Sequence, residues 1–242
     1  MSKKILMISD THFSKNNSLL FNKYDVENSI GKLKDKINLE NPDYIFLLGD
    51  ISQDGSIESY IKVKNFFAQF NCPKYVIMGN HDSEDIKNML DDKIIRTDYL
   101  DIQNHRFIFL SSYKGLGFGE GYISEIELEK IKKYFNSNMQ NYLLIHHHFI
   151  KTNGIMDKAI LENHLHFCEY ISKFDIKAVF HGHVHNPYST ALGNIVIYAN
   201  PSTCVQFALA KTLKLEPIIG FRVINILENG YDQKTYLESL QI

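Results

Sequence analysis

Short runs of apolar, β-prone residues recur through the first third of the chain, and amphipathic patterns of helical period separate them. Residues 3–9, Tyr44–Leu48 and Lys74–Met78 are predicted to be buried strands. Two sets of apolar residues recur between them at helical spacing: Val26, Ile30, Leu33 and Ile37, then Tyr60, Val63, Phe67 and Phe70. This β-α-β-α-β order predicts a parallel sheet with right-handed crossovers.

The middle of the chain is less regular but keeps the alternation. We expect a helical turn with short strands, then three longer strands, over residues 83–104, Phe107–Leu110, 142–145 and 176–180. Two helices are predicted between the longer strands, with apolar faces formed by Leu128, Ile131 and Phe135 and by Leu161, Leu165 and Cys168. Ser124 and Glu127 have the spacing of a capping box at the start of the first of these helices.

The part of the chain after His185 has short β-prone segments and few helical ones. Candidate strands lie at Tyr188–Leu192, Ile195–Tyr198, near Val205, at Phe221–Leu227 and at Thr235–Leu237. Gly193-Asn194, between the first two, is a hairpin signal. We predict a second sheet here, packed on the first. Because no internal repeat or linker divides the chain, we expect one α/β domain over residues 1–242.

Composition and charge narrow the class of protein. With 44% hydrophobic and 22% charged residues, the chain is expected to form a large buried core. The net charge of −2 lacks the basic excess of proteins that bind long nucleic acid, so we expect no nucleic-acid partner. A small anionic substrate is compatible with this balance, because a bound metal would supply positive charge locally.

Cysteine usage and the distribution of apolar residues suggest a compartment. Cys72, Cys168 and Cys204 are far apart and form no CxxC pair, which disfavours a disulfide framework and favours a reducing environment. The apolar run after Lys3 and Lys4 is shorter than a signal peptide requires, and no window approaches a membrane span. We therefore expect a cytoplasmic protein with no membrane partner.

Five clusters of metal-ligand side chains follow predicted strands. They are Asp10-Thr11-His12, Gly49-Asp50, Gly79-Asn80-His81-Asp82, His146-His147-His148 and Gly182-His183-Val184-His185. Side chains at the carboxyl ends of strands in an α/β sheet converge on one crevice. Carboxylate, amide and imidazole groups from five such ends are therefore expected to build one metal site.

The spacing within the clusters suggests how the ligands are presented. On an extended backbone alternate side chains point the same way, so Asp10 and His12 would lie side by side, as would His183 and His185. Asp50, with two free oxygens, is suited to bridge two metals. Two metals about 3.5–4 Å apart can hold a bridging hydroxide and clamp a phosphoryl group.

This ordered set resembles the calcineurin-like metallophosphoesterase superfamily, from Asp10 to about Phe207. The resemblance implies a four-layer α-β-β-α sandwich of two packed mixed β-sheets. It also implies two metal sites, formed by Asp10, His12, Asp50 and His185 and by Asp50, Asn80, His146 and His183. The metals would be iron, manganese or zinc.

The same resemblance implies the catalytic groups. Asp50 and His81 would be catalytic, with His81 as general acid, and the substrate would contact His12, Asn80, His81 and His185.

A sixth segment, Asn200–Phe207, is similar to the Thr-Pro-Ser-Thr-Cys-Val-Gln-Phe stretch of bacterial class III 3′,5′-cyclic nucleotide phosphodiesterases. Gly220-Phe221-Arg222 resembles the Gly-Trp-Arg of the same group. This chain departs from the group at Phe149, where proline is usual, and at Asn200, where threonine is usual. The resemblance implies hydrolysis of cyclic nucleotides, with cAMP converted to AMP by attack of a metal-bound hydroxide on phosphorus.

Several residues near the motifs keep alternative interpretations. The roles of His147 and His148 are open, with one expected to face away from the site. His181 is interpreted as structural or as a support for the ligands, and Cys204 as a small buried residue rather than a nucleophile. The Gly115–Gly121 loop is expected to be a plain surface loop, with a substrate cover as the alternative.

Other functions compete with cyclic-nucleotide hydrolysis. One is a broad-specificity phosphodiesterase or phosphomonoesterase that acts on 2′,3′-cyclic nucleotides or other small phosphoesters. Another is a non-catalytic scaffold that keeps the fold as a binding surface, which is disfavoured because all seven ligand positions carry competent donors. A homodimer is an open possibility.

Overall fold

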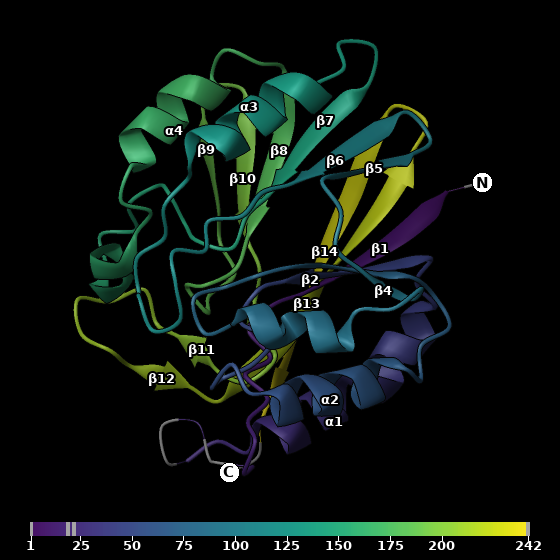
Figure 1. Cartoon of the computed structure of the whole chain (residues 1–242), viewed down its shortest axis with the longest axis vertical. Coiled ribbons are helices and arrows are strands. Elements are labelled where there is room, and N and C mark those ends of the chain that lie inside the picture. The colour runs from purple at the N-terminus through teal and green to yellow at the C-terminus, as the bar shows by residue number, and fades with distance from the viewer. Residues whose placement is uncertain (1, 18–19, 21–22, 241–242) are drawn as a thin grey trace.

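The structure is a computed structural model that describes residues 2–17, 20 and 23–240. The helices are α1 (Val26–Glu40), α2 (Ile57–Phe67), α3 (Glu125–Tyr134) and α4 (His164–Ile171), with 3₁₀ helices η1 (Glu84–Met89) and η2 (Ile155–Ala159). Two six-stranded sheets face each other, with α1 and α2 outside one sheet and α3 and α4 outside the other (Figure 1). The predicted α-β-β-α sandwich of two mixed sheets is confirmed.

The first sheet has the strand order β14-β13-β1-β2-β3-β4. Its strands are β1 (Lys3–Ile8), β2 (Tyr44–Leu48), β3 (Lys74–Ile77), β4 (Ile94–Ile95), β13 (Ile218–Leu227) and β14 (Gly230–Ser239). Strands β1 to β3 are parallel, as predicted, and β4 continues in the same direction, whereas β13 is antiparallel to both β1 and β14.

The second sheet has the order β5-β6-β7-β8-β10-β9 and is parallel from β6 to β10. Its strands are β5 (Tyr99–Ile102), β6 (His105–Phe109), β7 (Gln140–Leu144), β8 (Ile176–His181), β9 (Ser189–Leu192) and β10 (Ile195–Ala199). A separate two-stranded sheet joins β11 (Gln206–Phe207) and β12 (Leu215–Glu216).

The prediction that the strands after His185 form the second sheet is wrong in part. Only β9 and β10 join it, and most of that sheet is built from the middle of the chain. The last two strands return to the first sheet, where β13 pairs with β1. The prediction grouped these strands because they are close in sequence. The antiparallel pairing of β13 with the first strand, however, depends on contacts between the two ends of the chain.

Strands β1 and β2 bury both faces. In β1, Leu6 and Ile8 pack toward α1 and α2, whereas Ile5 and Met7 pack into the layer between the sheets. Alternation of side chains along a strand produces this division. The layer between the sheets is rich in aromatic residues, including Phe46, Phe107, Phe109, Tyr142 and Phe180. This packed layer holds the strand ends that carry the metal-ligand clusters.

Two helix predictions differ from the structure in detail. Leu165 in α4 is 74% exposed, and the helix instead buries Phe167 and Ile171. Ser124 caps α3 by accepting a hydrogen bond from the backbone N–H of Glu127. The Glu127 carboxylate, however, accepts from the backbone N–H of Ser111 at 2.9 Å, so it ties α3 to the end of β6.

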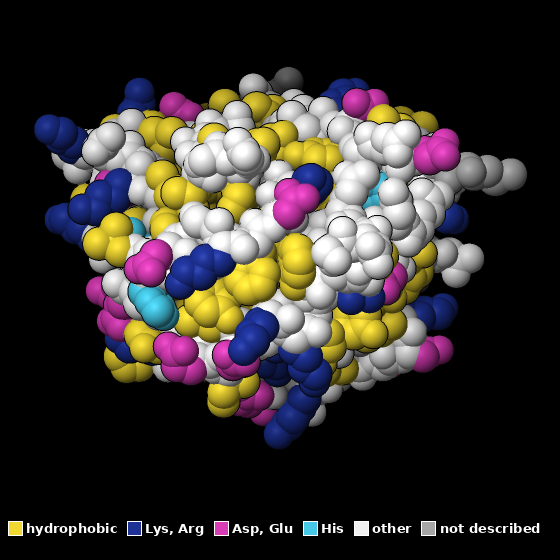
Figure 2. Space-filling view, turned by 90° about the horizontal axis from the view of Figure 1, so that it is seen from above, with side chains coloured by type: hydrophobic (Ala, Val, Ile, Leu, Met, Phe, Trp, Pro, Cys, Tyr) yellow, Lys and Arg dark blue, Asp and Glu magenta, His cyan; other side chains and the backbone are white. Residues whose placement is uncertain are grey.

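Surface charge and the state of the cysteines are the next features of the structure. On the face in Figure 2, basic and acidic side chains are interspersed among apolar ones. Cys72, Cys168 and Cys204 are all free. Among the helices of the described ranges, none combines the length and apolarity needed to cross a membrane.

Candidate metal centre

The candidate metal centre lies where strand ends from both sheets meet. Asp10 lies two residues beyond β1, Asp50 two residues beyond β2 and Asn80 three residues beyond β3, all in the first sheet. His146 and His183 lie two residues beyond β7 and β8 of the second sheet. The five clusters therefore meet between two packed sheets rather than at the edge of one.

The backbone is left-handed at five of the seven predicted ligands. The φ angles are 55° at Asp10, 48° at His12, 50° at Asp50, 69° at His183 and 46° at His185. The expectation of extended Asp-x-His and His-x-His segments is therefore wrong, and each pair is presented by a turn. Such conformations cost roughly 1–3 kcal/mol per non-glycine residue and occur where surrounding contacts impose them, commonly at functional sites.

Three buried imidazoles are oriented by backbone carbonyl groups. The pairs are His146 Nδ1 with Leu48 O at 2.8 Å, His185 Nδ1 with Val205 O at 3.0 Å and His183 Nε2 with Ala159 O at 3.0 Å. A carbonyl oxygen accepts, so each of these nitrogens carries a proton. The other nitrogen of each ring offers a lone pair once the ring is neutral, which is the arrangement found in histidine metal ligands.

Two buried carboxylates face these rings. Asp10 Oδ1 lies 3.4 Å from His185 Nε2, and Asp50 Oδ2 lies 3.4 Å from His146 Nε2. Burial opposes ionisation, but the neighbouring imidazoles lower the pKa of Asp10 to about 2 and that of Asp50 well below its usual range. Both carboxylates are therefore charged at neutral pH.

The donor set fits a metal centre. His12 Nε2 and His185 Nε2 are 3.0 Å apart, and the His185 proton is already placed on Nδ1. With both rings neutral, a cation beside this pair would be a partner for the lone pairs of the two nitrogens. Ligand atoms of His12, Asp50 and His81 lie within 4.8 Å of one another, as do those of Asp10, Asp50 and His146. Mixed oxygen and nitrogen donors suit several first-row metals.

A cavity of 320 Å³ opens above these groups. It is lined by His12, Leu20, Asp50, Gln53, Asn80, His81, Gly119, Met156, Ala159, His183, His185 and Phe207. Asp10 and His146 are fully buried and lie outside this lining. The polar groups gather with apolar residues such as Leu20, Met156 and Phe207, so the cavity can hold a ligand that is part ionic and part apolar.

His81 belongs to the cavity rather than to the buried ligand set. Its ring meets the His12 ring edge-on at a centroid distance of 5.0 Å. Its Nδ1 lies 3.1 Å from the Gln53 carbonyl oxygen, and its backbone N–H donates to Asp50 Oδ1 at 2.8 Å. The carbonyl contact holds a proton on Nδ1, which leaves Nε2 for a substrate.

Asp82 organises the loops of the site, a role that the sequence did not reveal. Its buried carboxylate accepts from the backbone N–H groups of Gly79 at 2.9 Å, Ser52 at 3.0 Å and Ile51 at 3.3 Å, and from the Tyr60 hydroxyl at 3.2 Å. One side chain therefore joins the loop after β2 to the loop after β3, which carry Asp50 and Asn80. The clue in the sequence was its place directly after His81.

His147 and His148 are both buried and both contact the His183 ring, so the expectation that one faces away from the site is wrong. His147 Nδ1 lies 2.7 Å from Ser112 Oγ, and the ring lies 4.6 Å from the His183 ring. The His148 ring stacks on His183 at 5.5 Å. They enclose His183. His181 is buried outside the cavity lining with its Nε2 3.2 Å from the Tyr188 hydroxyl, which fits its interpretation as structural or as a support for the ligands.

The segment that resembles the phosphodiesterases packs against the ligands. Phe207 stacks on the His185 ring at 4.2 Å and 13°. Cys204 is fully buried, with its Sγ 3.0 Å from Ser202 Oγ, in agreement with its interpretation as a small buried residue. The two departures from the group, Phe149 and Asn200, are buried and lie outside the cavity lining.

The Gly115–Gly121 loop borders the cavity, so the expectation of a plain surface loop is wrong. Gly119 contributes to the lining, and the backbone N–H of Gly117 donates to the Asn80 carbonyl at 3.1 Å. At Gly121 a Cβ would lie 2.4 Å from His147 Nδ1, so only glycine allows this close approach.

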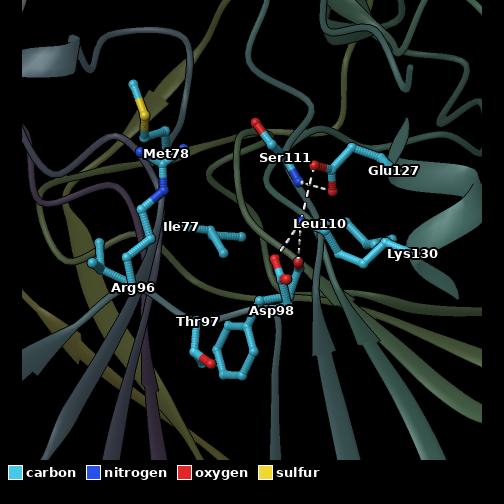
Figure 3. Close-up of a pocket in the computed structure, with 11 residues that line it drawn as sticks. Ile77, Met78, Arg96, Thr97, Asp98, Leu110, Ser111, Glu127 and Lys130 are labelled. Atoms are coloured by element: carbon cyan, nitrogen blue, oxygen red, sulfur yellow. Dashed lines mark hydrogen bonds and ion pairs between the residues drawn. The ribbon is translucent and has the colours of Figure 1, made fainter. Parts of the chain in front are cut away.

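A second cavity, of 290 Å³, lies beside the ends of β3 and β6 and is not part of the centre (Figure 3). Its charged side chains neutralise one another. Lys130 Nζ lies 2.9 Å from Asp98 and 3.0 Å from Glu127, and Arg96 pairs with Glu84 at 3.8 Å. With its charges already paired, this cavity has no excess charge for a ligand to neutralise.

Metal binding is expected to release protons. Burial disfavours the charged imidazole, but Asp50 raises the pKa of His146 from 6.5 to about 9. His146 must be neutral to bind a metal, so apparent metal affinity should rise with pH through this window and fall by about tenfold per unit below it for each proton released. Despite burial, Asp10 raises the pKa of His185 well above 6.5, so His185 would release a second proton. Calorimetric titration of the metal-free protein in two buffers of different ionisation enthalpy measures the released protons. Identical heats in the two buffers at neutral pH would contradict this expectation.

The fold and the site together define a class, a two-sheet hydrolase built around a cluster of carboxylate and imidazole metal donors. The family model described as calcineurin-like phosphoesterase matches residues 3–187. The chain belongs to the calcineurin-like phosphoesterase family. It is a metal-dependent phosphodiester hydrolase of that family, whose enzymes work with a dinuclear metal centre.

The names of similar proteins are consistent with membership of this family. The 3′,5′-cyclic adenosine monophosphate phosphodiesterase CpdA of Haemophilus influenzae is 29% identical over 84% of this chain and 77% of its own length. A probable glycerophosphodiester phosphodiesterase GpdQ of Arcobacter nitrofigilis is 30% identical over 88% and 83%. The crystal structure of a dimetal phosphatase from Danio rerio has a TM-score of 0.69 and 11% identity, over 96% of this chain and 98% of that one. The last likeness shows the fold alone.

Proposed function

We propose that this protein is a dinuclear-metal phosphodiesterase that hydrolyses 3′,5′-cyclic nucleotides, with cAMP converted to AMP. The observation that carries the proposal is the cavity in which His81, the buried donor cluster and the stacked Phe207 ring meet. The similarity to CpdA phosphodiesterases and the Asn200–Phe207 segment support the choice of substrate.

The metal ligands belong to the same proposal. One ion would be held by Asp10, His12, Asp50 and His185, and the other by Asp50, Asn80, His146 and His183, with iron, manganese or zinc as the metal. The backbone carbonyls on three of the imidazoles support these assignments, because they fix which ring nitrogen is free to bind. When bound, the two ions supply Lewis-acid stabilisation of the phosphoryl oxygens and an activated water nucleophile.

The chain's own groups would orient the substrate and protonate the leaving oxygen. His12, Asn80, His81 and His185 line the cavity and would contact the phosphoryl group. His81, as an imidazolium whose Nδ1–H donates to the Gln53 carbonyl, would give its Nε2 proton to the 3′ oxygen as it leaves. A flat nucleobase would lie on the apolar side, next to Phe207, Met156 and Leu20.

A second candidate is a broader phosphodiesterase that accepts glycerophosphodiesters. The similarity to the GpdQ protein favours it, and the apolar part of the cavity carries no charged side chain that would select a base. In this case catalysis would use the same residues, and only the group bound beside Phe207 would differ.

A substrate panel separates the two candidates. Metal-loaded protein should hydrolyse 3′,5′-cAMP with a higher kcat/KM than 2′,3′-cAMP, a glycerophosphodiester or bis(p-nitrophenyl) phosphate, with 5′-AMP as product. Phe207→Leu should raise the KM for cAMP by about tenfold, equivalent to the loss of one stacking contact of about 1–1.5 kcal/mol. It should leave the glycerophosphodiester unaffected. A higher kcat/KM for the glycerophosphodiester would overturn the cyclic-nucleotide assignment.

A further inference from the structure

Arg222 is a buried cation at the open edge between the two sheets. It lies on β13, is 2% exposed, and shares the face of that strand that carries Ile224 and Ile226 into the layer between the sheets. Its contacts are all with uncharged groups. Nε donates to Asn200 Oδ1 at 3.3 Å, Nη2 to the Ala199 carbonyl at 2.8 Å and Nη1 to Gln233 Oε1.

The guanidinium also lies over the Tyr198 ring, 4.9 Å from its centroid. Within residues 2–17, 20 and 23–240, no carboxylate forms an ion pair with it. Burial lowers its pKa from 12.5 to about 10, so it keeps its charge at neutral pH. A buried charge without a partner is unfavourable by several kcal/mol in general, and proteins normally pair it.

This cation faces a cavity of 260 Å³, here called the edge cavity, between the edge strands β9 and β14. The edge cavity is lined by Pro187, Tyr188, Ser189, Tyr198, Arg222, Gln233, Thr235 and Leu237. Among the residues that the structure describes, its lining contains hydroxyl and amide groups that can donate hydrogen bonds, and no carboxylate. It shares no residue with the catalytic cavity.

Charged side chains at two other places in the protein have partners that balance their charge. In the cavity of Figure 3, Lys130 is neutralised by Asp98 and Glu127. In the metal centre, the carboxylates face imidazoles. At Arg222 three of five N–H groups reach uncharged acceptors, and the positive charge remains unmatched by any side chain of the edge cavity.

We propose that the edge cavity is a second, non-catalytic binding site for a small oxyanion, a phosphate group or a carboxylate, which pairs with the Arg222 guanidinium. The planar guanidinium has donors left for such a group and matches its geometry. Ser189 of β9 and Thr235 of β14 line the edge cavity, and each has a hydroxyl that could donate to an anion bound there. The aromatic walls, Tyr188 and Tyr198, suit a flat organic body attached to it.

Gln233→Glu tests the proposal, because it places a carboxylate against the guanidinium. Gln233 is exposed and contacts Arg222, so the variant should fold. Without added anion its Tm should exceed that of the wild type, because the buried charge gains a partner. With inorganic phosphate, acetate or benzoate added to metal-loaded protein, the anion-dependent rise in Tm assigned to this site should be weakened at least tenfold in apparent affinity.

Lys234→Gln is the matched control. It changes the net charge by the same one unit, one residue along β14, on the opposite face of the strand. It should keep the wild-type response to all three anions, which excludes a general charge effect. Hydrolytic activity should be unchanged in both variants, so failure of the proposed catalytic function would not affect this result.

The three probes distinguish the sources of the oxyanion. A response to phosphate but not to acetate or benzoate would assign a phosphate site, and the reverse would assign a carboxylate site. A crystal of the full chain grown with tungstate should show density at the Arg222 guanidinium. An equal anion response in the wild type and Gln233→Glu, with no density at Arg222, would overturn the proposal.

Discussion

Replacing Asp50 by asparagine is expected to lower kcat/KM by about 10³-fold or more while the fold is retained. The new amide oxygen would still accept from the His81 backbone N–H, which now bonds Asp50 Oδ1 at 2.8 Å, so the loop should keep its shape. The variant would lose the charge that faces His146 at 3.4 Å and His12 at 3.8 Å. Loss of indirect supports alone typically reduces metal affinity or activity 10–100-fold, and a bridging ligand should matter more.

Metal content gives the second readout for Asp50→Asn. The wild type should retain about two ions per chain after gel filtration, and the variant should retain fewer. Asp232→Asn, the same change at an exposed position of β14, should alter neither activity nor metal content. If Asp50→Asn keeps two ions and full activity, the bridging assignment is wrong.

Replacing His81 by glutamine should lower kcat for cAMP by roughly 10²–10⁴-fold without loss of metal, because general acid catalysis contributes about that much. His81 lies at the cavity wall, is not one of the proposed ligands, and has Nε2 free of the Gln53 contact. A chromogenic diester with an acidic phenol as leaving group needs little protonation. Its hydrolysis should therefore fall much less than that of cAMP.

The comparison of the two substrates is what identifies proton donation. His166→Gln, an identical change at a half-exposed position on α4, should leave both rates at the wild-type level. Equal losses on cAMP and on the chromogenic diester would show that His81 positions the phosphoryl group and does not protonate the leaving oxygen.

Most strands could be predicted because their burial is continuous. β2 carries Ile45 and Leu47 toward the helices and Phe46 and Leu48 toward the other sheet, so the whole run is apolar and stands out. The assignment of strands to sheets could not be predicted in the same way. The pairing of β13 with β1 joins residues more than 200 positions apart, such as Ile226 with Lys3, and no local pattern records it.

The candidate site shows the same division between local and long-range information. The seven ligands could be proposed because donors follow strands in an order that resembles that of a known family. The backbone conformation at these residues could not be predicted from local sequence. The left-handed φ angles at Asp10 and His185 depend on long-range hydrogen bonds, such as that from the Asp10 N–H to the Gly49 carbonyl. Met156 in the cavity wall has no signal in the sequence, because η2 reaches the cavity only through the tertiary fold.

The division of the proposed ligands between the two sheets also bears on how the chain stays folded. Asp10, His12, Asp50 and Asn80 come from the first sheet, and His146, His183 and His185 come from the second. An ion bound by both groups would close a chain loop that runs from residue 10 to residue 185, much as a long-range cross-link does. The catalytic ions would then stabilise the packing of the two sheets as well as support hydrolysis. A chelator would therefore remove activity and at the same time lower the free energy of unfolding.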